Sequence, residues 1–170
     1  MLKEMTQKKL RIFDFDDTLV HVIAKIHITH GDGSKESITP AEYAVYEPKS
    51  DDKFDFKEFS SMIKKAKPIE SNIKRLKVAM SDSNTKTTIL TARLLGYPIK
   101  KYLRDHYNLD PYVIGLGSSN PQDKADWIEK QIKKGYEDVE FIDDSYKNIE
   151  AVEGLRKKYP KIRLKTELVK

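Results

Sequence analysis

Short apolar runs alternate with longer amphipathic segments along the second half of the chain. Residues 86–91, 111–117, 138–144 and 161–169 carry the apolar and β-branched side chains that are typical of strands. Each of the first three runs is followed by a segment with apolar residues at helical spacing. Alternating strands and helices predict a parallel sheet with helices on both faces. The helices are expected over residues 96–107, 121–134 and 145–159.

The first half of the chain is less regular. Residues 9–15 form an apolar run that ends in acidic residues, which predicts a buried strand. Two extended runs then flank residues 31–33, a Gly-Asp-Gly tip, so a β-hairpin is expected. Thr39 and Pro40 are typical of a helix start. After them the pattern predicts a polar loop over 47–55, a short helix within 55–67, and a longer helix opening at Pro68 with Ile69, Ile73, Leu76 and Met80 on one face.

The composition narrows the class of protein. A chain of 170 residues with 38% hydrophobic and 35% charged residues predicts one compact domain over residues 1–170. It has no cysteine, which excludes disulfides, thiolate metal sites and cysteine nucleophiles and favours the cytoplasm. No apolar run approaches the roughly 18 residues of a membrane span, so no membrane partner is expected.

Polar residues suited to catalysis stand where the predicted strands end. Asp14 and Asp16 follow the first strand, Thr91 ends the second, and Asp143 and Asp144 end a late one. Ligands of parallel α/β sheets bind beyond the carboxyl ends of the strands, so these residues are expected to meet there. Two carboxylates about 4 Å apart repel by roughly 4 kcal/mol at an effective dielectric of 20. The cluster therefore needs a cation, and Mg²⁺ prefers such oxygen ligands.

The same edge is also suited to an anion. Lys124 lies in the first turn of the helix that Asn120 and Pro121 begin, where the helix dipole and the ammonium both favour negative charge. Thr91 adds a hydroxyl donor. An aspartate can act as a covalent nucleophile, and a second acid nearby can protonate the leaving oxygen and then activate water.

Four segments in this order resemble the motifs of the haloacid dehalogenase superfamily. They are DFDDT at residues 14–18, ILTAR at 89–93, the helix-start Lys124, and FIDDS at 141–145. The resemblance implies an α/β fold of Rossmannoid type, with three α/β/α layers and a mostly parallel sheet. It also implies a β-hairpin flap at about residues 19–39 and a small helical, cap-like insertion at about 40–66, which would leave an open site.

The resemblance also implies a role for each motif residue. Asp14 would be the nucleophile and Asp16 the general acid and base of a phosphatase, because relatives that cleave carbon–halogen bonds lack an acid at that position. Mg²⁺ would be held by Asp14, the backbone carbonyl of Asp16 and Asp143, with Asp144 binding through water or orienting ligands. The phosphate would be held by Thr91 and Lys124.

Several alternatives remain open at this point. Lys124 would alternatively be a surface lysine, and Asp144 a neighbour of a helix cap at Ser145. Arg93 is either a phosphate contact or a surface charge. The hairpin histidines are expected to be solvated, and a metal site or a substrate contact are the alternatives. These histidines are His21, His27 and His30.

The charge balance of the chain bears on the class of substrate. A net charge of +5 favours anionic partners, although solvated helix faces also explain it. The chain is loosely similar to polynucleotide 3′-phosphatase domains, so the first expectation is a nucleic-acid end or a nucleotide, and a sugar phosphate is the alternative. Two classes other than phosphatases also remain open. One is a response-regulator receiver domain, which also forms an aspartyl phosphate, and the other is a non-catalytic phosphate-binding protein. No feature indicates an oligomeric state.

Overall fold

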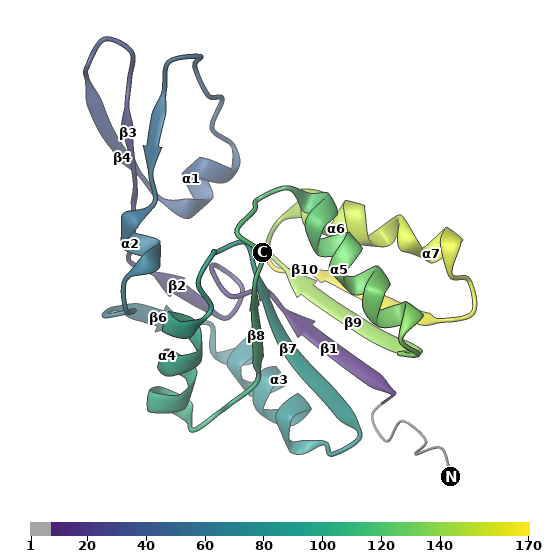
Figure 1. Ribbon diagram of the computed structural model, residues 1–170. Coiled ribbons are helices and arrows are strands. Elements are labelled where there is room, and N and C mark those ends of the chain that lie inside the picture. Colours follow the sequence, from purple (N-terminus) through teal and green to yellow (C-terminus); the bar gives the residue numbers. More distant parts are fainter. Residues whose placement is uncertain (1–7) are drawn as a thin grey trace.

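A five-stranded parallel sheet forms the centre of the molecule in the computed structural model, which describes residues 8–170 (Figure 1). Its strand order is β10-β9-β1-β7-β8, and helices flank it. The predicted parallel α/β sheet is confirmed. The strands are β1 (Lys9–Phe13), β7 (Thr85–Thr91), β8 (Tyr112–Gly115), β9 (Asp138–Asp143) and β10 (Arg163–Leu168).

Helices cover both faces of this sheet because successive strand residues point to opposite sides. In β1, Leu10 and Ile12 belong to the core under α5, α6 and α7, whereas Phe13 belongs to the core under α3 and α4. The predicted helix over 145–159 is divided at Gly154, which caps α6. The helices are α3 (Glu70–Ser81), α4 (Tyr97–Tyr107), α5 (Pro121–Lys133), α6 (Tyr146–Glu153) and α7 (Leu155–Lys158).

The strand order reverses beside β1. The chain runs outward from β1 to β7 and β8, then crosses to β9 and β10 on the other side. Numbered along the chain, the order is 5-4-1-2-3, which is the Rossmann order and differs from the 2-1-3-4-5 order of receiver domains. The switch point, where such folds bind ligands, lies between β1 and β9.

The prediction that a helix opens at Pro68 is wrong by two residues. Pro68 ends β6 (Ala66–Pro68), which pairs antiparallel with β2 (Val20–Val22). The Ile69 amide still donates to the Leu19 carbonyl at 2.8 Å, which keeps the chain extended until α3 begins at Glu70. The paired β2 and β6 form a stem below a smaller lobe.

We call residues 26–60 the outer lobe. The expected hairpin is present there, because β3 (Ile26–Thr29) pairs with β4 (Lys35–Ile38). The helix α1 (Pro40–Ala44) starts behind Thr39 with a capping box. The predicted loop over 47–55 is wrong at its end, because β5 (Lys53–Asp55) joins β3. The helix expected within 55–67 shrinks to α2 (Lys57–Ser60), so this segment is not purely helical.

The outer lobe has a small core of its own. Ile26, Ile28 and Ile38 are buried in it, and aromatic rings from α1, β5 and α2 pack against them. The polar segment 47–55 ends in a strand because β5 places Phe54 against these isoleucines. Within residues 8–170, no helix is both long enough and apolar enough to cross a membrane.

Candidate active site

Three aspartates meet at the switch point of the sheet. Asp14 extends β1 by one residue, and its amide donates to the Ile142 carbonyl at 2.9 Å. Asp143 ends β9, and Asp144 follows it. Carboxylate oxygens of Asp14, Asp143 and Asp144 lie within 4.8 Å of one another, and Asp14 and Asp143 are buried. The sequence-based expectation that these side chains converge is therefore correct.

Lys124 lies between two of these carboxylates. Its Nζ donates to Asp14 Oδ1 at 2.9 Å and to Asp143 Oδ2 at 2.8 Å. The side chain comes from the first turn of α5, and the residue is only 3% exposed, so the surface alternative is wrong. Burial alone would lower the pKa of Lys124, but the attraction of Asp14 and Asp143 raises it above the ordinary lysine value. We call these four residues (Asp14, Asp143, Asp144 and Lys124) the floor.

The floor has fewer positive than negative charges. Burial raises the pKa of Asp14 well above its usual range, Lys124 partly opposes this rise, and Asp143 and Asp144 add to it. Burial likewise raises the pKa of Asp144, to about 6. A further cation would relieve this repulsion between carboxylates. The donor set consists of hard oxygen ligands, so it fits Mg²⁺.

Two neighbours, Ser145 and Asn148, fix Asp143 through contacts that the sequence did not predict. The Ser145 amide donates to Asp143 Oδ1 at 2.8 Å, and Asn148 Nδ2 donates to Oδ2 at 3.0 Å. Ser145 also caps α6 through the Asn148 amide, as expected for the residue after Asp144. The position of Asn148, one turn into the helix behind the acidic pair, is the only signal in the sequence that points to it.

A tight turn separates Asp16 from the floor. The amides of Thr18 and Leu19 both donate to the Phe15 carbonyl, at 3.2 and 2.9 Å, and Asp17 has a positive φ of 61°. The hydroxyl of Thr18 turns back and donates to Asp14 Oδ2 at 2.9 Å. The carboxylate of Asp16 is not part of the group of three aspartates that could hold a metal ion. Its expected role as a ligand concerns only its backbone carbonyl.

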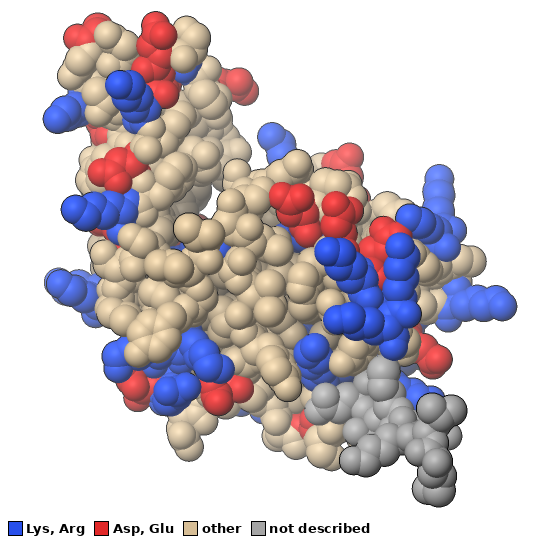
Figure 2. All heavy atoms as spheres, viewed as in Figure 1, with Lys and Arg blue, Asp and Glu red and all other residues tan. Residues whose placement is uncertain are grey.

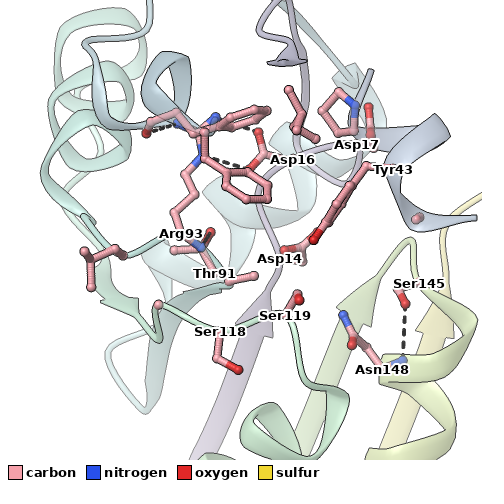
Figure 3. A pocket seen from close by; sticks show the side chains of 18 of the residues that line it. Asp14, Asp16, Asp17, Tyr43, Thr91, Arg93, Ser118, Ser119, Ser145 and Asn148 are labelled. Atoms are coloured by element: carbon pink, nitrogen blue, oxygen red, sulfur yellow. Dashed lines mark hydrogen bonds and ion pairs between the residues drawn. The ribbon is translucent and has the colours of Figure 1, made fainter. Parts of the chain in front are cut away.

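Arg93 holds the carboxylate of Asp16. Its Nε donates to Oδ2 at 2.8 Å and its Nη2 to Oδ1 at 2.7 Å, while Nη1 donates to the Phe59 carbonyl of α2 at 3.1 Å (Figure 3). Arg93 is buried, so the surface-charge alternative is wrong. Thr91 orients this loop, because its Oγ1 accepts the Arg93 amide at 3.1 Å. Arg93 thus connects Asp16 to the outer lobe.

A cavity of about 810 Å³ lies between the sheet edge and the outer lobe, visible as the hollow between the lobe and the body in Figure 2. The outer lobe contributes three aromatic side chains to it. Figure 3 shows Tyr43 with its hydroxyl end directed toward Asp14. The predicted site residues that line the cavity are Asp14, Asp16, Thr91, Lys124 and Asp144, whereas Asp143 lies fully buried beneath them.

The three histidines pair with carboxylates, but the prediction that all three lie on the hairpin is wrong for His21, which lies in β2 and pairs with β6. His21 Nδ1 lies 2.9 Å from Asp17 Oδ1, and His27 Nε2 contacts Glu58. His30 contacts Asp52 and Glu36. In the part of the chain that the structure describes, the three floor aspartates are the only group of acidic or imidazole side chains placed to hold a metal, so the histidine metal alternative finds no support.

Comparison of the chain with models of known families, with curated proteins and with solved structures gave no match.

Proposed function

We propose that this chain is a Mg²⁺-dependent phosphomonoesterase of the haloacid dehalogenase type, with Asp14 as the nucleophile. One observation carries the proposal: the Asp14 carboxylate stands at the switch point, bound by a buried lysine, flanked by two acids and open to a large cavity. Bound Mg²⁺ would be held by Asp14, Asp143, Asp144 and the Asp16 carbonyl, and would supply charge neutralisation and polarisation of a phosphate oxygen.

The first half of the reaction transfers the phosphoryl group to the chain. A carboxylate oxygen of Asp14 attacks phosphorus and forms an acyl phosphate, while the bond from phosphorus to the ester oxygen breaks. Asp16 gives its proton to that leaving oxygen, so the product departs as a neutral alcohol. Lys124 and Thr91, which line the same cavity, stabilise the negative charge on the phosphoryl oxygens.

The second half returns the chain to its starting state. Asp16, now a carboxylate, takes a proton from water, and the water oxygen attacks phosphorus. The bond between phosphorus and the Asp14 oxygen breaks, which releases inorganic phosphate and restores both carboxyl groups. The same acid therefore serves both half-reactions, as general acid and then as general base.

The ion pair between Arg93 and Asp16 adds a step before the phosphoryl transfer. Both oxygens of Asp16 accept from the guanidinium, so neither is free to carry a proton toward an ester oxygen. The pair must open when the substrate enters, and the released guanidinium is then available to the anionic substrate.

The other classes fit the structure less well. A receiver domain would have a 2-1-3-4-5 sheet with its phosphorylated aspartate on a middle strand of the sequence, whereas Asp14 follows the first strand of a 5-4-1-2-3 sheet. A non-catalytic phosphate-binding protein would not need an acid at position 16. The presence of both Asp14 and Asp16 beside one cavity favours turnover.

Replacement of the nucleophile tests the proposal. Asp14→Asn is expected to lower phosphate release from p-nitrophenyl phosphate in Mg²⁺ by at least about 10³-fold. The fold should persist, because Lys124 keeps Asp143 as a partner. The matched control is Asp138→Asn, which removes a carboxylate bound to Arg11 at the opposite end of β9 and should retain activity.

A second readout identifies the intermediate. Rapid acid quenching of the wild-type protein during turnover should yield a peptide containing Asp14 with the added mass of one phosphoryl group. The same peptide from Asp14→Asn should lack it. Full activity of Asp14→Asn, or a phosphoryl group on another residue, would refute the assignment.

A further inference from the structure

The outer lobe presents an aromatic surface to the cavity. Tyr43, Phe56 and Phe59 all line it. The Tyr43 ring meets the Phe56 ring edge to face, with centroids 5.3 Å apart at 84°, and meets Phe54 in the same way at 5.7 Å. The centroid of the Phe59 ring lies 4.9 Å from the guanidinium carbon of Arg93. The three rings are therefore held in place by the lobe and by Arg93.

The loop after β7 contributes two exposed leucines to the cavity. Leu94 and Leu95 line the cavity from the loop after β7, and they are 76% and 48% exposed. The loop itself is fixed, because the Gly117 amide donates to the Arg93 carbonyl at 3.2 Å. At Gly115 a Cβ would lie 2.5 Å from the Leu94 carbonyl oxygen, so only glycine permits this close approach. Apolar side chains held exposed around a cavity mark a binding surface.

Besides Asp14, Lys124 and Asp144 of the floor, the charged residues that line the cavity are the paired Asp16 and Arg93, and Asp17 and Lys57. The uncharged polar side chains that line it are those of Tyr43, Ser60, Thr91, Ser118, Ser119, Ser145 and Asn148. A sugar ring would place hydroxyl groups against apolar side chains that cannot hydrogen-bond them, which costs free energy. A flat aromatic ring with polar edges would instead contact the rings and leucines, and the serines would be available to its edges.

We infer that the substrate is a nucleoside monophosphate, with its phosphate at Asp14 and its base between the outer-lobe aromatics and Leu94–Leu95. The inference rests on the proposed function, because the phosphate is placed by the floor. A cavity of about 810 Å³ is in the range that holds a ligand of this size.

Three phosphate esters, two with a base and one without, test the inference. Adenosine 5′-monophosphate and adenosine 3′-monophosphate are compared with ribose 5-phosphate in Mg²⁺ by their kcat/KM values. The better adenosine phosphate is expected to exceed ribose 5-phosphate by at least about 10-fold, the scale of one base stacked on aromatic side chains.

Substitutions among the outer-lobe aromatics and the leucines test which side chains cause the preference for a substrate with a base. Phe56→Ala and Leu94→Ala should each remove most of the preference for the adenosine phosphate while changing ribose 5-phosphate turnover less than about twofold. Leu94 is highly exposed on its loop, so that variant is expected to fold even if Phe56→Ala does not. The control is Tyr112→Ala, an exposed aromatic at the start of β8, which should change neither substrate.

The outcomes separate the inference from the proposed function. Equal turnover of ribose 5-phosphate and both adenosine phosphates would overturn the inference and leave the phosphatase intact. Faster turnover of hexyl phosphate than of phenyl phosphate would also overturn it, since the cavity would then prefer an aliphatic group. If no phosphate ester is hydrolysed, calorimetric titration of the wild-type protein with the same compounds still decides. Tighter binding of an adenosine phosphate supports the inference, and equal or no binding overturns it.

Discussion

The floor and the outer lobe face each other across one cavity and differ in almost every physical respect. The floor consists of buried charged groups joined by short ion pairs, such as Lys124 to Asp14 at 2.9 Å. The outer lobe presents aromatic rings in edge contacts, such as Tyr43 on Phe56. Buried charges stabilise the negative charge on a phosphoryl group, whereas an apolar surface selects ligands by their shape and size. The division predicts that chemistry and selectivity can be altered separately.

The two regions also differ in how they are assembled. Asp14 and Lys124 lie 110 residues apart in the chain and meet only because the parallel sheet is formed. The outer lobe builds its core from Ile26, Ile28 and Ile38, which are close in sequence. Changes in the floor should therefore reduce the stability of the whole sheet, and changes in the lobe should remain local.

The largest expected effect is that of Lys124→Met. The variant keeps a long side chain but leaves Asp14 and Asp143 facing each other without the ammonium between them. Breaking a buried pair in this way lowers the free energy of unfolding by about 3–5 kcal/mol. We expect to measure this loss by urea titration in EDTA, followed by circular dichroism. Mg²⁺ should restore part of this loss, because a cation again separates the carboxylates. Activity should fall by about 10³-fold.

Lys133→Met on the same helix is the matched control for that loss. Lys133 is exposed and pairs with Glu129 at 3.7 Å, so its removal should change the unfolding free energy by less than about 0.5 kcal/mol. Equal stability of the two variants in EDTA would show that the ammonium of Lys124 does not hold the floor together.

An intermediate effect is expected for Arg93→Gln, which removes the link between the two regions. Asp16 loses both of its donors and the Phe59 carbonyl loses one, so the acid and the lobe are both displaced. We expect kcat/KM to fall by about 10- to 100-fold for the adenosine phosphates and for ribose 5-phosphate alike. This uniform loss distinguishes Arg93 from Phe56, whose replacement should affect only substrates with a base.

Arg156→Gln is its control, since Arg156 makes an equally bidentate pair with Glu153 on the exposed surface, at 2.8 Å for both contacts. Surface pairs contribute between about 0 and 1 kcal/mol, so activity should stay unchanged. A selective loss of adenosine phosphate turnover in Arg93→Gln, with ribose 5-phosphate unaffected, would place Arg93 in base recognition instead.

The sheet and the floor could be predicted from the sequence for a physical reason. Residues at the carboxyl ends of parallel strands share one edge, so Asp14, Thr91 and Asp143 converge wherever the strands pair in parallel. The helix-start position likewise carries Lys124 to the same edge. These positions follow from strand pairing and the helix start alone and do not depend on how side chains pack.

The link between the regions could not be predicted in that way. Arg93 reaches Asp16 only because the chain turns at Asp17, whose positive φ is not encoded by any apolar period. The aromatic surface comes from α1 and α2, helices of five and four residues that are too short to show a period, so Tyr43 and the N-cap residue Phe56 gave no signal. Their roles depend on contacts between α1, β5 and α2, which only the folded lobe brings together.

The smallest expected effect concerns pH and the outer lobe alone. His30 Nδ1 lies 2.7 Å from Asp52 Oδ1, and its Nε2 lies 2.6 Å from Glu36 Oε2. Hydrogen bonds to Asp52 and then to Glu36 raise the pKa of His30 above its ordinary value of 6.5. Because the folded state binds the proton more tightly, this stabilisation is complete below the unfolded pKa and is lost as pH rises through the raised folded pKa.

Amide hydrogen exchange measures this effect strand by strand. After correction for the intrinsic exchange rate, protection of the β3 and β4 amides should decline a few-fold between about pH 6 and about pH 9, while β1 stays unchanged. His30→Asn should make the protection of the lobe independent of pH over that range. Parallel loss of protection in β1 would mean that the lobe and the sheet unfold as one unit, which would contradict the local assembly of the lobe.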